Sequence, residues 1–314
     1  MAAPRLFRLR AEVAAAPSGP IAGRLPVARV RVDTGVFHLD QLYDYSVPEK
    51  FNELIVPGVR VQLPFGNRET EGIVVDRVVN PEKAGTLKAI TKVLSPHPVA
   101  TSTTFDLIDR AAELYCCNPW DLLRSAIPPR VATVDKELQV VDQTSSSAKA
   151  KRTSSYESFI PFAPPHEQIG EIVAEFNRSG SVLIVAPDER DVDKLIVNLS
   201  GRFDNILKLS SASTREERYR NFLLSMRLEF SVVVGTRSSI FTPVRNLAAI
   251  IIYKESSPDH FELRSPGWNS STIAHMRAEK EGVVLVLTGF APSVRVANEI
   301  DARTIKFNNQ RRQV

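Results

Sequence analysis

The chain has 314 residues, 43% of them hydrophobic and 24% charged, with a formal net charge of +4. This composition is typical of a soluble globular protein with two domains. No apolar run approaches the roughly 18 to 20 residues of a transmembrane helix, so we expect no membrane span. The two cysteines, Cys116 and Cys117, are adjacent and form no C-x-x-C pair, which excludes a disulfide framework and favours a reducing cytoplasm.

The positive charge is concentrated at the start of the chain. Residues 1–32 contain six arginines and one acid, which gives +5, so the remaining residues sum to −1. This excludes a uniformly basic DNA-coating protein, and nucleic-acid binding would need a local groove together with the basic tail. Residues 1–24 lack the apolar segment of a secretory signal, so we interpret them as a disordered basic extension. A transit peptide and a wrongly assigned start codon are the alternatives.

Residues 25–130 are predicted to form a small, mainly-β domain. Four short segments have the apolar pattern of strands: Val27–Val32, Gly58–Leu63, Gly72–Asp76 and Ala89–Leu94. Turn residues separate these segments, and this spacing favours a barrel or a sandwich. A helix is expected over Thr101–Tyr115, because its apolar residues fall on one face.

The composition changes twice after this domain. Residues 131–160 are predicted to be a linker, because Gln139–Ser158 is rich in Ser, Thr and Lys and has hardly any large apolar residue. In residues 161–314, apolar strands alternate with helices, which favours a parallel sheet covered on both faces. We expect these strands at Val182–Ala186, Ile206–Leu209, Ser231–Val234, Ala248–Ile252 and Val283–Leu287. The predicted fold class is therefore α/β overall.

One segment of the second half resembles a known family. Val232–Leu247 reads VVVGTRSSIFTPVRNL and is similar to a segment of the PriA family (primosomal protein N-prime), the replication-restart helicases. Segments of the first half are similar to that family's amino-terminal domain in order and spacing: Leu42–Tyr45, Pro57–Val61, Pro64–Gly66, Leu87–Ile90 and Leu122–Pro129. The resemblance covers residues 25–300, is weakest between 131 and 180, and implies that the second half is a RecA-like helicase lobe.

For the first domain, the resemblance implies a pocket for the 3′ end of a nascent DNA strand. Tyr43, Asp44, Gly66 and Lys88 fall on the family's binding positions. The carboxylate of Asp44 could accept a hydrogen bond from a terminal 3′-hydroxyl, and Tyr43 could stack on a base. Gly66 would let the backbone approach the DNA closely, and Lys88 would meet the last phosphate. From the residues alone, Tyr43 could instead be a core residue, Asp44 a turn cap and Lys88 a solvated strand end.

A second candidate contact follows a strand of the α/β domain. Thr236 and Arg237 stand directly after the predicted strand at 231–234, and open α/β sheets bind ligands at this edge. These residues are candidates for contacting the DNA backbone through a phosphate. The alternative is a loop in which Arg237 forms an internal salt bridge.

The residues that hold ATP in the family have no counterpart in this chain. A motor helicase needs a Gly-rich loop ending in Gly-Lys-Ser/Thr, whereas the corresponding segment Phe159–Gln168 has three prolines and no lysine. After Ile250–Ile252, where the family has Asp-Glu-Glu-His, the chain reads Tyr-Lys-Glu-Ser-Ser. Lys254 would repel a metal ion there, and only Glu255 could serve as a ligand. We also find no match to the family's second motor lobe, zinc insertion or winged-helix unit.

The sequence therefore resembles the degenerate, helicase-inactive, actinobacterial-type branch of the family, in a shortened form. We expect a non-enzymatic replication-restart protein of the bacterial cytoplasm, associated with the nucleoid. No catalytic residue, metal or cofactor is expected, since ATP and zinc are family ligands whose motifs are absent. The expected partners are forked and single-stranded DNA, other primosome or restart proteins and single-strand-binding protein, but no membrane. A residual ATP-dependent helicase and a remnant that does not bind DNA are the alternatives.

Overall fold

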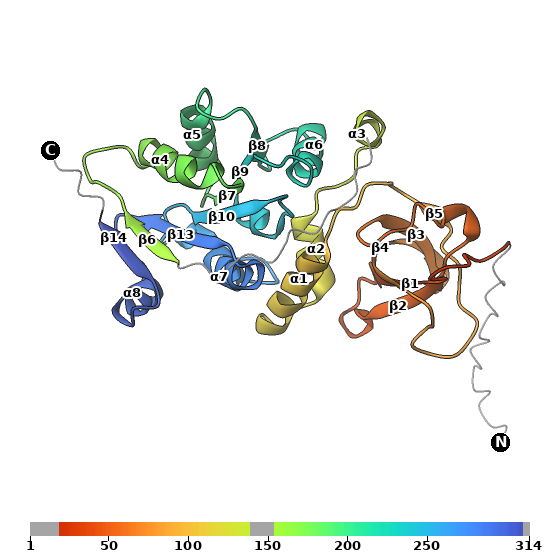
Figure 1. The fold of residues 1–314 in the computed structure, drawn as a ribbon. Helices are drawn as coiled ribbons and strands as arrows, with labels where there is room; N and C mark the ends of the chain where they lie inside the picture. Colours follow the sequence, from red (N-terminus) through yellow and green to blue (C-terminus); the bar gives the residue numbers. More distant parts are fainter. Residues whose placement is uncertain (1–18, 139–153, 310–314) are drawn as a thin grey trace, which may run out of the picture.

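The computed structural model describes residues 19–138 and 154–309. The predicted fold class is confirmed: a small antiparallel β domain is followed by an α/β domain with a parallel sheet. Figure 1 shows the β domain at one end of the molecule and the parallel sheet at the other, with helices α1 (Ser102–Leu114) and α2 (Pro119–Ala126) between them.

The first domain is a five-stranded sheet with the strand order β2-β1-β4-β3-β5. Its strands are β1 (Val27–Val32), β2 (Leu42–Ser46), β3 (Arg60–Phe65), β4 (Arg68–Val78) and β5 (Lys92–Val93). Residues 88–91 join the two edges of this sheet. Ser46 N–H donates to the carbonyl of Lys88 (2.9 Å), and Thr91 N–H donates to the carbonyl of Gln62 (3.0 Å). The sheet therefore closes into a small barrel, as the sequence predicts, and alternate side chains of each strand fill its interior.

The second domain is a parallel sheet of seven strands in the order β14-β6-β13-β10-β7-β9-β8. Its strands are β6 (Ser155–Ser158), β7 (Ser181–Val185), β8 (Ile206–Leu209), β9 (Val232–Gly235), β10 (Leu247–Ile252), β13 (Val284–Gly289) and β14 (Lys306–Asn309). Every residue of β7 and β10 is buried, so both faces of the sheet must be covered. A short hairpin, β11 (Phe261–Glu262) and β12 (Trp268–Asn269), follows β10.

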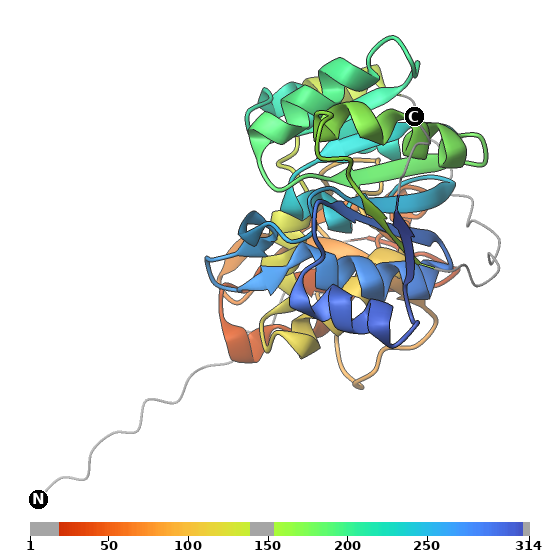
Figure 2. The same ribbon diagram turned by 90° about the vertical axis from the view of Figure 1, so that its left-hand side faces the viewer.

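Helices cover the two faces of this sheet. They are α4 (Pro165–Asn177), α5 (Glu189–Leu199), α6 (Arg215–Ser225), α7 (Ser270–Glu281) and α8 (Val294–Asp301). On one face, Val182 and Ile184 share a core with α4 and α5. On the other face, Leu183 and Val185 share a core with α6 and α7. In Figure 2, α4 and α5 (green) lie on one side of the sheet and α7 and α8 (blue) on the other.

Helices α1 and α2 complete the second of these two cores. Phe105, Ile108, Leu122 and Leu123 are buried together with side chains of the parallel sheet and of α7. The barrel has a separate core, which includes Val30 and other side chains of its own strands. The helices that follow the barrel in sequence therefore pack as part of the α/β domain.

A buried carboxylate strengthens the contact between the first domain and the α/β domain. Asp135 lies in helix α3 (Ala132–Glu137) and accepts hydrogen bonds from Ser95 Oγ (3.1 Å) and from the Tyr219 hydroxyl of α6 (2.8 Å). Because burial raises the pKa of Tyr219 to about 12, this hydroxyl stays protonated and donates. Arg60 of β3 donates to the carbonyl of Pro128 (2.6 Å), which ties the barrel to the same junction.

The predicted linker at 131–160 is wrong at both ends. Residues Ala132–Glu137 form α3, and Ser155–Ser158 form β6, whose Tyr156 is fully buried. Both segments are short and polar, so no local pattern predicts them, and contacts with distant residues hold them in place. Tyr156 packs parallel to the ring of Phe307 in β14 (5.9 Å between centroids). The middle of the predicted linker, 139–153, lies outside the described residues.

The predicted end of the basic extension, at residue 24, also lies too far along the chain. Residues 1–18 lie outside the described part of the chain. Ala22 is already 3% exposed, and its N–H donates to the carbonyl of Val47 (2.9 Å). The barrel therefore begins before residue 25. Among the described helices, none has the length and apolar character that crossing a bilayer requires.

We predict that Leu122→Ala lowers the free energy of unfolding by about 2–5 kcal/mol, because it opens a cavity in the core shared by α2 and the parallel sheet. Leu122 is 0% exposed. Leu114→Ala is the matched control, since Leu114 ends α1 and is 54% exposed; its effect should stay within about 0.5 kcal/mol. Denaturant unfolding measures both variants, and equal effects would contradict the shared core.

Candidate nucleic-acid interface

The candidate site in the first domain lies at one end of the barrel. The loop between β1 and β2 (residues 33–41) and the turn between β3 and β4 both reach this end. Arg68 Nη2 links them by donating to the carbonyl of Thr34 (3.1 Å). We call this end, formed by residues 33–43, 65–68 and 88, the barrel rim.

Tyr43 is packed into the barrel rim. Its ring contacts Phe65 edge to face, with 5.0 Å between the centroids and 78° between the planes. Its hydroxyl donates to the carbonyl of Leu39 (2.8 Å). The side chain is half-buried and borders the barrel core. Tyr43 therefore packs against the edge of the barrel core without being fully buried, and its stacking role stays a prediction.

Gly66 and Lys88 come together at the rim. Gly66 lies in the β3–β4 turn with a φ of +59°, and a Cβ built on it would meet no atom within 4 Å. The glycine is therefore needed for its backbone conformation, and the space in front of it is open. Lys88 Nζ lies 3.5 Å from the carbonyl oxygen of Gly66. A cation thus stands beside an exposed stretch of backbone.

Asp44 projects from the face of β2 opposite to Tyr43. Successive side chains of a strand point to opposite faces, so Asp44 lies on the outside of the barrel while its neighbour Tyr43 packs toward the core. The Asp44 carboxylate lies 3.6 Å from Nε of Arg29 and accepts the N–H of Glu82 (2.6 Å). Its side chain is 12% exposed. The structure therefore brings Tyr43, Gly66 and Lys88 to the rim, with Asp44 on the other face of β2.

The second candidate contact lies at the carboxyl edge of the parallel sheet. Thr236 caps the 3-10 helix η3 (Arg237–Phe241), which follows β9. Arg237 Nη1 donates to the carbonyl of Asp259 (2.7 Å), and Nη2 pairs with Glu262 (3.1 Å). Arg237 thus forms the internal salt bridge that the sequence left as the alternative. Its side chain is 30% exposed, so part of the guanidinium still faces solvent.

The segment that corresponds to the family's phosphate loop joins β6 to α4. Gln168 closes this segment on itself: its Oε1 accepts the N–H of Ile160 (2.7 Å), and its Nε2 donates to the carbonyl of Ala163 (2.8 Å). Helix α4 starts with Pro165 after the capping Pro164. Proline has no N–H, so the first positions of this helix offer fewer donors to a phosphate.

The charged side chains of Lys254 and Glu255, which follow β10, are also bonded to other residues of the chain. Lys254 Nζ lies 2.7 Å from both carboxylate oxygens of Asp191 in α5. Glu255 is 5% exposed and accepts hydrogen bonds from the N–H (3.1 Å) and the hydroxyl (2.9 Å) of Ser293. Within residues 19–138 and 154–309, no group of three or more His, Cys, Asp or Glu side chains is arranged to hold a metal ion.

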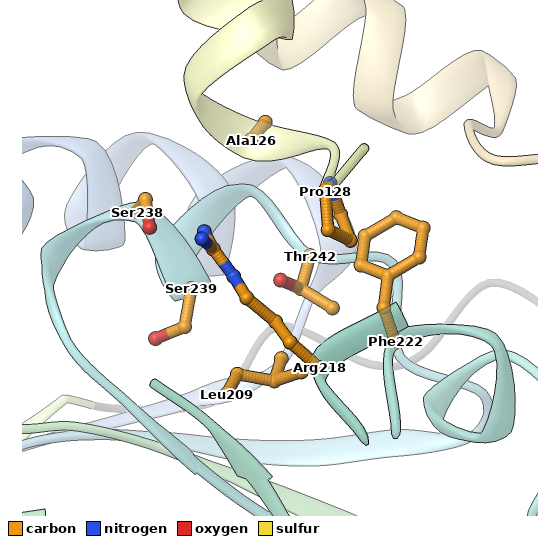
Figure 3. A pocket seen from close by; sticks show the side chains of 8 residues that line it. All are labelled: Ala126, Pro128, Leu209, Arg218, Phe222, Ser238, Ser239 and Thr242. Atoms are coloured by element: carbon orange, nitrogen blue, oxygen red, sulfur yellow. The ribbon is translucent and has the colours of Figure 1, made fainter. Parts of the chain in front are cut away.

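A small pocket lies where the end of α2 meets the parallel sheet (Figure 3). Its lining is Ala126, Pro128, Leu209, Arg218, Phe222, Ser238, Ser239 and Thr242. Figure 3 shows the Arg218 side chain extending into it from α6. Burial lowers the pKa of Arg218, against the opposing effect of the Glu189 carboxylate. No local sequence pattern indicates this pocket, because segments far apart in the chain line it.

The comparisons with known proteins agree with these two domains. Residues 29–128 match the family described as 3′DNA-binding domain (3′BD). The probable replication restart protein PriA of Mycobacterium tuberculosis (strain CDC 1551 / Oshkosh) is 28% identical over 278 residues, which cover 81% of this chain and 42% of that protein. The PriA of Mycobacterium leprae (strain TN) is 26% identical and covers 81% of this chain and 43% of that protein. The chain thus spans less than half the length of these relatives.

A third relative and one solved structure also resemble parts of this chain. The replication restart protein PriA of Thermotoga maritima is 25% identical over 150 residues, which cover 46% of this chain and 20% of that protein. The solved C-terminal domain of the DEAD-box protein Dbp5 matches 51% of this chain and 91% of that chain, with 13% identity. The TM-score of this match is 0.38.

Fold and site together define a small β barrel, which matches the 3′DNA-binding domain family over residues 29–128, joined to an α/β domain with a parallel sheet. The predicted resemblance to the PriA family is confirmed, and the chain is a relative of the PriA replication restart proteins.

We predict that the Lys254–Asp191 pair is formed in solution and contributes to stability. Asp191→Asn and Lys254→Met should each lower the free energy of unfolding by about 1–3 kcal/mol, since each leaves a half-buried charge without its partner. The double variant should lose at least about 0.5 kcal/mol less unfolding free energy than the two single variants lose together. A double-mutant cycle by denaturant unfolding measures this coupling. Additive losses would instead mean that Asp191 is free to serve another ligand.

Proposed function

We propose that this chain is a DNA-binding replication-restart protein that recognises stalled or abandoned forks through the 3′ end of the nascent leading strand, without hydrolysing ATP. The observation that carries the proposal is the pairing of Lys88 with the open backbone of Gly66, inside the region that matches a 3′DNA-binding domain. A lysine beside exposed backbone suits a terminal phosphodiester, because the ammonium supplies charge and the turn leaves space.

Asp44 has a defined role in this proposal. Its carboxylate already accepts the N–H of Glu82, which lies in the loop between β4 and β5. A 3′-hydroxyl is also a donor, so a terminal nucleotide would replace or join that N–H as a partner of the same carboxylate. An internal nucleotide has no 3′-hydroxyl and would not satisfy it. Reading of the 3′ end would therefore involve a displacement of the loop that carries Glu82.

The arrangement around the family's nucleotide site supports a function without ATP hydrolysis. Phosphoryl transfer in motor proteins depends on backbone N–H groups, a lysine and a magnesium ion held by an acid. Here the loop after β6 is closed by Gln168, and α4 starts with two prolines. Lys254 places a positive charge directly after β10 and is bound by Asp191. These residues do not fit a magnesium nucleotide, and we propose that neither ATP nor zinc is a cofactor of this chain.

The proposed partners follow from this role. Forked DNA would engage the barrel rim, and single-stranded DNA would cross the carboxyl edge of the sheet near Thr236, with the exposed part of Arg237 facing a phosphate. Other primosome or restart proteins and single-strand-binding protein are the proposed protein partners. The proposed location is the bacterial cytoplasm, at the nucleoid, without membrane attachment.

We predict that the chain binds forks with a 3′-hydroxyl end more tightly than forks with a 3′-phosphate end. We expect the two binding free energies to differ by about 1–3 kcal/mol, because an ionised carboxylate attracts a hydroxyl donor and repels a phosphate. Asp44→Asn should reduce this difference in binding free energy. Lys88→Ala should weaken binding to both kinds of fork. It should also reduce the slope of log binding constant against log salt concentration by about 0.7 to 0.9. Fluorescence anisotropy over a range of salt concentrations measures both effects.

The matched control for Lys88 is Lys194→Ala, because Lys194 is exposed on α5, far along the chain from the barrel rim. Lys194→Ala should leave the preference for the 3′-hydroxyl end and the salt dependence of binding unchanged. Equal affinity of the natural chain for the two ends would remove the 3′-end proposal. No binding to any fork would favour the alternative of a remnant without DNA affinity.

We predict that DNA-stimulated phosphate release stays at the level of a Glu255→Ala variant. Glu255 is the acid that follows β10, and it is buried in hydrogen bonds to Ser293. Steady-state phosphate release with ATP, magnesium and forked DNA measures the rate. Turnover clearly above the variant would establish the alternative of a residual ATP-dependent helicase.

A further inference from the structure

An exposed aromatic side chain stands on the barrel rim. Phe37 is 67% exposed, although a phenylalanine is more often buried. It opens the 3-10 helix η1 (Phe37–Leu39) in the loop between β1 and β2. Two further apolar side chains of the rim are partly exposed, Val36 at 40% and Leu42 at 36%. The rim therefore presents an apolar surface with one strongly exposed aromatic ring, on a loop that Arg68 joins to the turn of Gly66.

The loop that carries Phe37 is braced on both sides. On one side, the Thr34 hydroxyl donates to the carbonyl of Val36 (3.0 Å), and the carbonyl of Thr34 accepts from Arg68 (3.1 Å). On the other side, the carbonyl of Leu39 accepts from the Tyr43 hydroxyl (2.8 Å). A rigid loop loses little conformational entropy when a ligand binds, so an aromatic ring held in this way is suited to stacking.

Two further contacts fix the end of this loop. Asp40 pairs with Arg31 (3.3 Å) and accepts the N–H of Trp120 at the start of α2 (3.0 Å). Arg31 also pairs with Asp109 of α1 (2.8 Å). The rim is therefore held against the helices of the α/β domain.

The charges around Phe37 suit a nucleic-acid strand. Arg68 is exposed, and its guanidinium is anchored by one hydrogen bond to Thr34. Lys88 adds a second cation across the β3–β4 turn. The neighbouring acid Glu69 accepts a hydrogen bond from the Thr91 hydroxyl (2.8 Å). An aromatic face between cations is the combination with which proteins bind single strands, because bases stack on the ring and phosphates meet the cations.

We propose that Phe37 stacks on a base within the last nucleotides of the DNA strand whose 3′ end lies at Lys88, which adds a stacking surface to the predicted site residues. This inference rests on the proposed function. Tyr43 is half-buried, with its ring against Phe65 and its hydroxyl bonded to Leu39, whereas the Phe37 ring is 67% exposed. The ligand is therefore a single-stranded stretch that follows the rim from Lys88 toward Phe37.

Phe37→Ala tests this proposal, with a 3′-hydroxyl end on a single-stranded stretch as the ligand. The variant should bind about 5- to 150-fold more weakly, which is the range for one lost base–aromatic stack. Phe37→Trp should bind as well as the natural chain, whereas Phe37→Leu, which stays apolar without a ring, should bind like the alanine variant. Because Phe37 is exposed, all three variants should melt at the temperature of the natural chain.

A second readout locates the stacked base. The fluorescent base 2-aminopurine is placed at the first, second or third position from the 3′ end. The natural chain should quench one of these positions, and Phe37→Ala should lose that quenching. Phe162→Ala is the matched control, since Phe162 is 98% exposed on the α/β domain, and it should keep both affinity and quenching.

The outcomes separate this inference from the proposed function. If Lys88→Ala weakens end binding while Phe37→Ala changes neither affinity nor quenching, the stacking role is wrong and the 3′-end site stands. If Phe37→Leu binds as well as the natural chain, the contact is apolar but not a stack, which also overturns the inference. If the natural chain binds no DNA end, both proposals fail.

Discussion

One face of the parallel sheet is covered by helices from both halves of the chain, and the rest of the structure depends on this packing. Side chains of α1 and α2 are buried against the same face as those of α6 and α7. Removing this much apolar surface from water is the dominant favourable contribution to folding. It also fixes the barrel to the α/β domain, because Arg60 and Asp40 bond to the segments that these helices hold in place.

The two regions that correspond to family sites differ in what they offer a ligand. At the carboxyl edge of the sheet, charged and amide groups bind one another: Lys254 with Asp191, Arg237 with Glu262, and Gln168 with its own loop. A ligand there would have to replace internal partners, which costs the energy of those contacts. At the barrel rim, Lys88, Arg68 and Phe37 are held in place but still face solvent to different degrees. The rim is therefore the better prepared surface for DNA.

The sequence by itself determined the strand and helix pattern, the order of the two domains and the resemblance to the PriA family. These properties depend on local signals, such as alternation in Val27–Val32 and the continuous apolar run of β10, or on runs of matching residues such as Val232–Leu247. Local signals also explain the errors. The predicted linker overlaps α3 and β6 because neither segment has an apolar period, and contacts with distant residues such as Tyr219 and Phe307 hold both segments in place.

Only the tertiary structure decided which site residues share a surface. Resemblance groups Tyr43, Asp44, Gly66 and Lys88, and the structure adds that Tyr43 and Asp44 project from opposite faces of β2. The exposure of Phe37 could not be predicted either, because a phenylalanine in a loop is as compatible with a core as with a surface. Side-chain direction and solvent exposure depend on how distant segments pack, and a sequence pattern records only the distances along the chain.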